Sequence, residues 1–492
     1  MRRPRRKLFS FSPFSLTFSL GLLAAGCASH RAALPPPIVV VQPDTSRFRK
    51  PEGPAFPSAS LDSLLTSPTV DGARVSALVV SLADRKRLYS RNAGQGLTPA
   101  SVQKLLTSAA ALYWLSPQFK FSTEVRWDGR DLYVVGGGDP SLTEEDLRDL
   151  ARDVRRKELG RIRNLLLDGS YLDTLRFGEG WSPEDTLYPY HPMLSAFVCE
   201  HDFVTLTVSP KARGKYARVE VEPRTRAVQA RSKVEVVDEG RVSIRISQKA
   251  TRYGVTFDLS GHIASGNKDE AFTRNVADPA WLAGNLFREA LLAEGIRMRG
   301  KVREGTSPAE AKTIAVHRSQ ALADLLRTMN KESDNLYAEQ VLKTLGAERA
   351  GPPGSADKGL LAVRGFLDTL GVRQDSYRIV DGSGLAHANT LSAETLVEVL
   401  AWIYKQFRLS PEFVSTLPVA GEDGTLARRL GQASRLTRAK TGTLTGVSSL
   451  AGYAVDKRGE VLAFAILVNG FPGPVSEIRD IQDEVVKKLN VW

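Results

Sequence analysis

The chain of 492 residues is long enough for two or three domains, each with a hydrophobic core of its own. Hydrophobic residues make up 42% of the chain and charged residues 25%, which excludes a largely disordered protein and a protein with many membrane spans. The formal net charge is +12, and five basic residues among the first seven leave +7 for the rest, a mild surplus that suits an anionic polymer of the cell envelope as well as nucleic acid.

The first 27 residues have the pattern of an export signal. A basic segment, Met1–Lys7, precedes the apolar run Leu8–Ala25, which is followed by Gly26 and Cys27. Serines, a threonine and a proline interrupt this run, which makes it a weak membrane span. Its end, Leu-Leu-Ala-Ala-Gly-Cys, resembles a bacterial lipobox, although an alanine stands where leucine is commonest. We therefore expect residues 1–27 to be a signal peptide with a lipobox and Cys27 to be lipidated, in preference to a freely secreted protein.

The residues that follow indicate where such a lipoprotein would be held. Ala28, rather than an aspartate, comes after the cysteine, and by resemblance to lipoprotein sorting this favours the outer membrane of a Gram-negative cell. Residues 28–58 contain seven prolines and are predicted to form an extended, semi-rigid tether. The expected location is the periplasm, with the lipid as the only attachment to a membrane.

Cysteine and histidine usage argues against disulfides and metals. Only Cys27 and Cys199 occur, so lipidation of the first leaves no partner for a disulfide. Cys199 follows Ala-Phe-Val and is expected to be a small buried residue. The six histidines are scattered and form no short-spaced pair of ligand type, so we expect no metal and no cofactor.

The folded body is predicted to begin near residue 59 with a short amphipathic helix, followed by strands over 75–82 and 87–91. A second helix comes next. Thr98 can cap it, Pro99 suits its first turn, and apolar residues recur at helical spacing over 102–113.

This helix would carry a serine and a lysine on one face. Ser101 falls in the first turn, where free backbone N–H groups and the helix dipole favour negative charge, and Lys104 lies three residues on. A serine hydroxyl is a weak nucleophile until a base takes its proton, and a lysine with a lowered pKa can be that base. Alone the pattern is weak evidence, because Ser355 and Lys358 repeat it in a turn-like stretch.

From about residue 120 the pattern of the sequence changes. Strands are predicted over 119–127, 131–135 and 165–168, with a charged helix over 144–157, and residues 200–262 alternate apolar and polar positions as antiparallel strands do.

We interpret residues 120–275 as an inserted, mainly β region that interrupts one catalytic domain built from residues 59–119 and 276–492. The catalytic domain is predicted to end with a hairpin and an amphipathic helix, over residues 449–455, 460–468 and 475–489.

Two further motifs strengthen the interpretation of Ser101 as a nucleophile and Lys104 as its base. Ser333-Asp334-Asn335 stands at the start of a predicted helix, and Lys440-Thr441-Gly442 stands just before the terminal hairpin. The pattern S-x-N is common and occurs twice more, at 90–92 and 265–267, whereas K-T-G occurs once. S-x-x-K, S-D-N and K-T-G occur together in β-lactamases and penicillin-binding proteins, and here they follow in that order.

The motifs supply the groups that acyl transfer needs. Ser101 attacks, Lys104 takes its proton, Ser333 relays a proton to the departing amine, and Asn335 holds the substrate backbone. Lys440 provides positive charge for a terminal carboxylate and is expected to lower the pKa of Lys104 by repulsion.

The last motif also serves binding. Thr441 and Thr443 offer hydroxyls to the same carboxylate, and Gly442 lets a substrate lie against the strand edge. The backbone N–H groups of Ser101 and Thr443 would form the oxyanion hole.

With these motifs the chain resembles the class C low-molecular-mass penicillin-binding proteins, D-alanyl-D-alanine carboxypeptidase/endopeptidases of the penicillin-binding protein 4 type. The resemblance covers residues 60–490, and the long gap between Ser101 and Ser333 fits it, because that family inserts two β-rich domains there. Further stretches look like the family's signatures: Gly137–Leu142, Gly180-Trp181 with Asp185, Asp381–Leu385, Leu417–Leu426 and Lys440–Leu444. The resemblance implies an α/β (α+β) fold, a serine β-lactamase/transpeptidase-like domain with an inserted, mainly β region of two small domains.

The resemblance also implies a role for Asp185, which matches a family position that binds the diaminopimelate side chain; an aspartate at this place could equally cap a turn. Two departures leave the substrate preference open. Ala386-His387 stands where the family usually has Ser-Arg, and Glu200–Asp202 stands where an asparagine is common.

The expected function is that of a serine-type D-Ala-D-Ala carboxypeptidase/endopeptidase that acts on peptidoglycan stem peptides and cross-links through a Ser101 acyl-enzyme. β-Lactam antibiotics would acylate it as inhibitors, and nucleic acid is not an expected partner. A β-lactamase or esterase of the same fold, and a catalytically silent wall-binding lipoprotein, are the alternatives.

Overall fold

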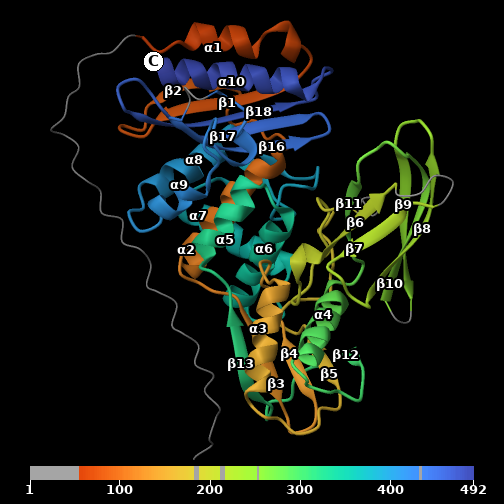
Figure 1. Ribbon diagram of the computed structural model, residues 1–492. Coiled ribbons are helices and arrows are strands. Elements are labelled where there is room, and N and C mark those ends of the chain that lie inside the picture. The colour runs from red at the N-terminus through yellow and green to blue at the C-terminus, as the bar shows by residue number, and fades with distance from the viewer. Residues whose placement is uncertain (1–54, 182–187, 211–215, 252–253, 432–434) are drawn as a thin grey trace, which may run out of the picture. The chain divides into compact units, whose positions relative to one another are not determined.

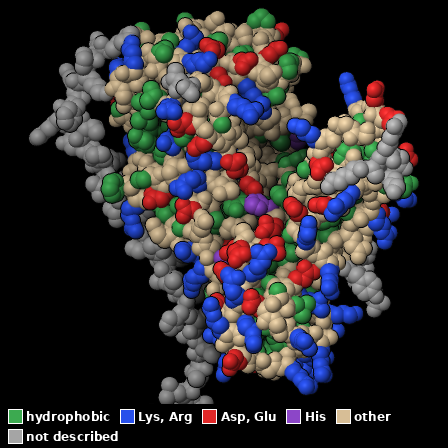
Figure 2. Space-filling model, viewed as in Figure 1, with side chains coloured by type: hydrophobic (Ala, Val, Ile, Leu, Met, Phe, Trp, Pro, Cys, Tyr) green, Lys and Arg blue, Asp and Glu red, His purple; other side chains and the backbone are tan. Residues whose placement is uncertain are grey.

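The computed structural model describes residues 55–181, 188–210, 216–251, 254–431 and 435–492 (Figure 1). The predicted signal peptide, Cys27 and nearly all of the tether lie outside the described residues. Within the described ranges, no helix is long and apolar enough to cross a membrane. On the face shown in Figure 2, Lys and Arg side chains are interspersed with Asp and Glu.

The catalytic half is built on a five-stranded antiparallel sheet whose strands come from both ends of the chain. Its order is β16-β17-β18-β1-β2. The strands are β1 Arg74–Ser81, β2 Arg87–Arg91, β16 Thr437–Leu444, β17 Val447–Val455 and β18 Val461–Asn469. The predicted terminal hairpin is confirmed as β17 and β18, which are buried along nearly their whole length because helices cover both faces of the sheet.

Helices α1 Ser58–Leu65 and α10 Val475–Val491 pack together on one face of this sheet, above it in Figure 1. On the other face α8, Ala393–Tyr404, contacts β1, β17 and β18. The helices α2 Lys104–Leu115, α5 Leu322–Lys331, α6 Asn335–Ala350, α7 Ala356–Thr369 and α9 Ser410–Thr416 complete this side. α2 contacts all four of the others, and ten of its twelve residues are buried, as expected of a central helix.

The inserted region contains three sheets. A mixed sheet has the order β12-β5-β4-β3-β13, and two three-stranded sheets have the orders β11-β6-β7 and β8-β10-β9. The mixed sheet is made of β3 Ser122–Trp127, β4 Leu132–Val135, β5 Leu165–Asp168, β12 Val302–Glu304 and β13 Lys312–Arg318. The others are made of β6 Phe203–Ser209, β7 Arg218–Glu222, β8 Val228–Val237, β9 Ser243–Thr251, β10 Gly254–Ala264 and β11 Glu270–Asn275.

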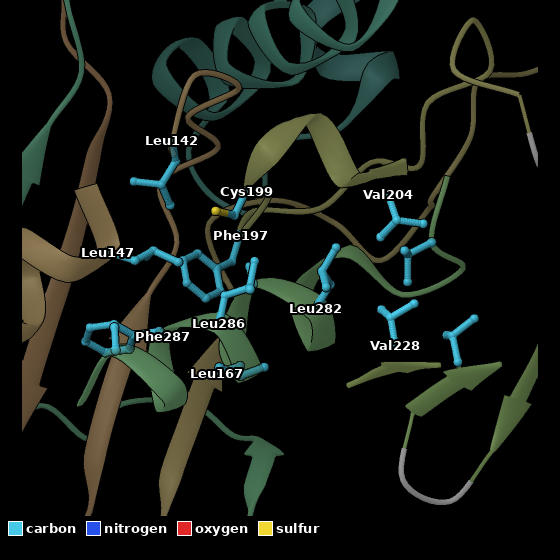
Figure 3. Close-up of a cluster of buried hydrophobic side chains, with 14 of the residues drawn as sticks. Leu142, Leu147, Leu167, Phe197, Cys199, Val204, Val228, Leu282, Leu286 and Phe287 are labelled. Atoms are coloured by element: carbon cyan, nitrogen blue, oxygen red, sulfur yellow. The ribbon is translucent and has the colours of Figure 1, made fainter. Parts of the chain in front are cut away.

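Two helices, α3 Glu144–Arg155 and α4 Pro279–Ala293, pack in this region and share its core (Figure 3). Leu147 of α3, Leu286 of α4 and Phe197 point toward one another there. Cys199 lies in the same cluster, and burial raises the pKa of its thiol well above the ordinary value, so the expectation of a small buried residue is confirmed.

The predicted return to the catalytic domain at residue 276 comes too early. β12 pairs in parallel with β5, β13 pairs antiparallel with β3, and α4 contacts β5 and β12. The chain therefore stays with the mixed sheet through Arg318 and reaches the catalytic helices at α5. The helical spacing after Pro279 is the same in either domain, and the partners of β12 and β13 lie more than 100 residues earlier in the sequence, where no local pattern identifies them.

Candidate active site

Ser101 lies in a single 3₁₀ turn, η2 Ala100–Gln103, that leads into α2. Thr98 does not cap this turn as predicted: its backbone N–H donates to Asn469 Oδ1 at 2.8 Å and its carbonyl accepts from the same amide, which ties the segment to β18. Ala100 has φ +49°, a strained conformation for a residue with a side chain. The tertiary anchor and the strain together present Ser101 at the mouth of the site.

Lys104 is fully buried beside Ser101, and each proton of its ammonium group has an acceptor. Its Nζ atom lies 3.0 Å from Ser101 Oγ, 2.6 Å from Asn335 Oδ1 and 2.9 Å from the carbonyl oxygen of Ser383. Burial lowers the pKa of Lys104 to about 8, although the negative charges of Asp381 and Glu339 oppose the shift. Burial, rather than the predicted repulsion by Lys440, is therefore the main cause.

These contacts orient the amine once it loses a proton. Asn335 Oδ1 and the Ser383 carbonyl can only accept hydrogen bonds, so they hold the two N–H groups of neutral Lys104. The lone pair is then directed at Ser101 Oγ, whose hydroxyl proton it can accept. The arrangement is that of a base bonded to a nucleophile without any histidine.

Ser333 has a lysine partner of its own. Lys440 Nζ donates to Ser333 Oγ at 2.8 Å and to the carbonyl of Thr441 at 2.8 Å. Lys440 is fully buried, and burial together with the charge of Lys104 holds its pKa well below the ordinary value. Ser333 has φ +62°, and strain of this kind is typical of residues that a surrounding structure holds for function.

Asn335 is the first residue of α6, with the preceding Asp334 as its N-cap. Its Nδ2 donates to the carbonyl of Tyr190 at 2.7 Å while its Oδ1 accepts from Lys104. The Asn335 side chain therefore links Lys104 to the inserted region. The sequence predicted only a contact with substrate for this residue. Asp185 lies outside the described residues.

A pocket of about 570 Å³ joins the motifs. Ser101, Ser333, Thr441 and Thr443 all line it, together with Arg479 of α10 and others. Thr443 Oγ1 accepts from Arg479 Nη2 at 3.1 Å, and the hydroxyl of Thr441 bonds to that of Thr425 at 2.8 Å. The guanidinium of Arg479 adds positive charge to the pocket beside a threonine predicted to bind a carboxylate.

Gly442 is a place of close backbone approach. A Cβ atom here would lie 2.7 Å from the carbonyl oxygen of Pro99 and 3.0 Å from the backbone nitrogen of Ser101. The glycine thus lets the edge strand β16 lie against the turn that carries the nucleophile. This contact within the protein is a reason for glycine that the sequence did not indicate; room for a substrate along the strand edge stays a prediction.

The loop Asp381–Leu385 contributes a group that sequence reasoning missed, the carbonyl of Ser383. The carboxylate of Asp381 accepts from Gln103 Nε2 at 3.1 Å and from Trp181 Nε1 at 3.0 Å, which connects the loop to the nucleophile's turn and to the inserted region. Its Asp-Gly-Ser-Gly sequence indicates a glycine-rich loop, but it does not indicate which carbonyl group faces Lys104. Among the described residues, no cluster of three or more His, Cys, Asp or Glu side chains could hold a metal ion.

The chain is similar in sequence to known carboxypeptidases. The sequence matches the D-Ala-D-Ala carboxypeptidase 3 (S13) family over residues 57–490. It is 35% identical to a D-alanyl-D-alanine carboxypeptidase of Actinomadura sp. (strain R39), over 87% of this chain and 83% of that one. It is 28% identical to the D-alanyl-D-alanine carboxypeptidase DacB of Haemophilus influenzae, over 85% of this chain and 90% of that one.

The fold matches as well. The crystal structure of penicillin binding protein 4 (dacB) from Haemophilus influenzae aligns with a TM-score of 0.78 and 25% identity, covering 89% of this chain and 100% of that one. A complex of the same protein with a β-lactam aligns with a TM-score of 0.74. The predicted serine β-lactamase/transpeptidase-like fold with an inserted region is thereby confirmed. The chain belongs to the D-Ala-D-Ala carboxypeptidase 3 (S13) family and is a serine peptidase.

Proposed function

We propose that this protein removes the terminal D-Ala from peptidoglycan stem peptides, and opens D-Ala cross-links, through an acyl-enzyme on Ser101. The observation that carries the proposal is the environment of Lys104, whose Nζ lies 3.0 Å from Ser101 Oγ while two acceptors hold its other N–H groups. The carboxypeptidase relatives and the penicillin-binding structure support it.

In the proposed first step neutral Lys104 takes the hydroxyl proton of Ser101 as Oγ bonds to the carbonyl carbon of the penultimate D-Ala. The backbone N–H groups of Ser101 and Thr443 stabilise the charge that develops on the carbonyl oxygen. The C–N bond then breaks, and the amine of the terminal D-Ala leaves with the proton that Lys104 took from Ser101, passed on through Ser333, which Lys440 hydrogen-bonds; Lys104 is then neutral again. Water cleaves the resulting ester, which releases the shortened peptide and restores the serine hydroxyl.

Recognition of the chain end is assigned to the other side of the pocket. Lys440 provides charge, and the hydroxyls of Thr441 and Thr443 provide donors, for the C-terminal carboxylate. Arg479 supports this role through its hydrogen bond to Thr443. Asp185 is proposed to bind the diaminopimelate side chain further along the peptide.

The experiment that tests the proposal offers the purified protein three substrates: a peptide ending in D-Ala-D-Ala, a cross-linked peptide dimer and a chromogenic cephalosporin. Release of D-alanine from the first and cleavage of the second, both lost in S101A, are expected. Rapid turnover of the cephalosporin with no D-alanine release would identify a β-lactamase instead. Inertness toward all three would identify a silent wall-binding protein.

The proposed location is the periplasm, with Cys27 lipidated and inserted in the outer membrane after the signal peptide is removed. The basic start, the apolar run and the lipobox-like end of the signal support it. In a Gram-negative host the protein is expected in the outer-membrane fraction, and its C27A variant is expected to be absent from that fraction. An unchanged distribution would contradict the lipid anchor.

A further inference from the structure

Glu339, one turn after Asn335 on α6, is a carboxylate buried beside the active site with only 1% of its surface exposed. Its partners are backbone N–H groups of the Asp381–Leu385 loop. Oε1 accepts from Gly382 at 2.9 Å and from Ser383 at 2.8 Å, and Oε2 accepts from Gly382 at 3.1 Å. Burial and the nearby charge of Asp381 raise the pKa of Glu339 to about 7.

The loop that Glu339 holds is fixed from its other side by the segment of the nucleophile. Thr107 Oγ1 of α2 donates to the carbonyl of Gly382 at 2.7 Å. Gly384 has φ +81°, and a Cβ atom there would lie 2.0 Å from the carbonyl oxygen of Ala100. The loop is therefore wedged between α6 and the turn that carries Ser101, with its peptide planes bonded on both sides.

The orientation of one of these peptides determines what Lys104 can do. The amide of Ser383 donates to Glu339, and the carbonyl of the same residue accepts from Lys104 Nζ at 2.9 Å. If that carbonyl turned away, neutral Lys104 would lose one of its two fixed acceptors, and its lone pair would no longer be held toward Ser101.

We propose that Glu339 is a positioning residue for the general base: its carboxylate fixes the Asp381–Leu385 loop so that the Ser383 carbonyl directs the lone pair of Lys104 at Ser101. The inference rests on the proposed function, because it assigns Lys104 as the base. Glu339 touches no reacting atom. It acts through the Ser383 carbonyl and through its negative charge.

The test measures the rate constant of acylation by a β-lactam as a function of pH, with the melting temperature, for E339Q and E339D. E339Q removes the charge, and even when its amide oxygen keeps both bonds of Oε1, its N–H₂ is set against the Gly382 N–H that Oε2 accepts. We expect a loss of at least about tenfold at the optimal pH, and a midpoint of the pH–rate curve lower by about 1 pH unit, because a negative charge near Lys104 is gone. E339D keeps the charge but withdraws it by one methylene group, so the rate is expected to fall while the midpoint stays near that of the wild type.

K343M is the matched control, since Lys343 is a buried charged residue one turn further along α6 that bonds to Asp173 at 2.6 Å and not to the loop. It is expected to lower the melting temperature and to leave the midpoint unchanged. A wild-type midpoint in E339Q, with no greater loss of rate than in K343M, would overturn the proposal. If E339Q does not fold, acylation of E339D at the wild-type rate would overturn it.

Failure of the proposed function gives a different result. In that case the wild-type protein itself forms no adduct that depends on Ser101, and no curve can be measured. A wild-type adduct together with E339Q behaviour like that of K343M refutes the role of Glu339 alone.

Discussion

Replacing Gly442 by alanine is predicted to impair acylation while the fold is kept. The added Cβ would lie 2.7 Å from the Pro99 carbonyl oxygen, whereas ordinary contacts begin at 3.4 Å, so β16 and the nucleophile's turn have to separate by about 0.7 Å. A displacement on the order of 1 Å in a catalytic constellation costs about 100-fold in rate. The same separation widens the space between the two backbone segments assigned to the oxyanion hole, and loss of one such donor costs about 100- to 1000-fold. We therefore expect the second-order rate constant of acylation by a β-lactam to fall by about 100-fold.

The assay follows the appearance of the acylated protein by intact-mass spectrometry at several drug concentrations, alongside a thermal melt. G365A is the matched control, because Gly365 lies in α7 with nothing within 4 Å of its added Cβ. It is expected to acylate at the wild-type rate and to be more stable by up to about 1 kcal/mol. A G442A protein that acylates within about threefold of the wild type would refute the argument that this contact positions Ser101.

Three further predictions concern the charged groups in and around the active site. The acylation rate should rise with pH with a midpoint near 8, because Lys104 has to lose its proton before it can accept one from Ser101. A rate that is flat between about pH 6 and pH 8 would contradict the role of Lys104 as the base. K440M should reduce D-alanine release by about 100-fold or more, because Ser333 loses its hydrogen-bond partner. The melting temperature should stay unchanged or rise, because a methionine replaces a buried cation. Near-normal turnover would exclude Lys440 and Ser333 from the reaction. R479Q should raise the KM for a peptide with a free C-terminal carboxylate by about tenfold and leave kcat within about twofold, since the guanidinium beside Thr443 is lost. An unchanged KM would show that Arg479 does not contribute to substrate binding.

Much of the catalytic half could be predicted from local patterns. The terminal hairpin is indicated by two apolar runs on either side of a turn, and the closing helix and the helix after Lys104 by apolar residues at helical spacing; each is present with small changes at its ends. The three motifs could be assigned to one site because their chemistry is complementary. Their contacts, such as Lys440 with Ser333 at 2.8 Å, join residues 107 positions apart.

The details that sequence reasoning missed depend on contacts between distant segments. Threonine is a residue type that often caps helices, but the Thr98 hydroxyl donates to the carbonyl of His387 and its backbone binds the Asn469 amide. The pKa of Lys104 depends on burial by surrounding helices, which no motif reports. Arg479 comes from an amphipathic helix in which nothing in the sequence distinguishes it from other charged residues; only the packing of that helix on the sheet brings it to Thr443.

Glu339 could have been recognised in part. It follows Asn335 by four residues, which puts both on one side of α6. A carboxylate on the side that faces a catalytic lysine is a signal worth weighing. Which backbone groups it would bind could not be read, because the Asp381–Leu385 loop lies more than 40 residues away in the sequence.

The central claim is that Ser101 is the nucleophile of this serine peptidase. The most direct measurement is the intact mass of the purified protein after incubation with benzylpenicillin, beside the S101A variant, with peptide mapping of any adduct. The account predicts one adduct of the drug's mass on the peptide that contains Ser101, and no adduct in S101A. An adduct that persists in S101A, or maps to another residue, would contradict it.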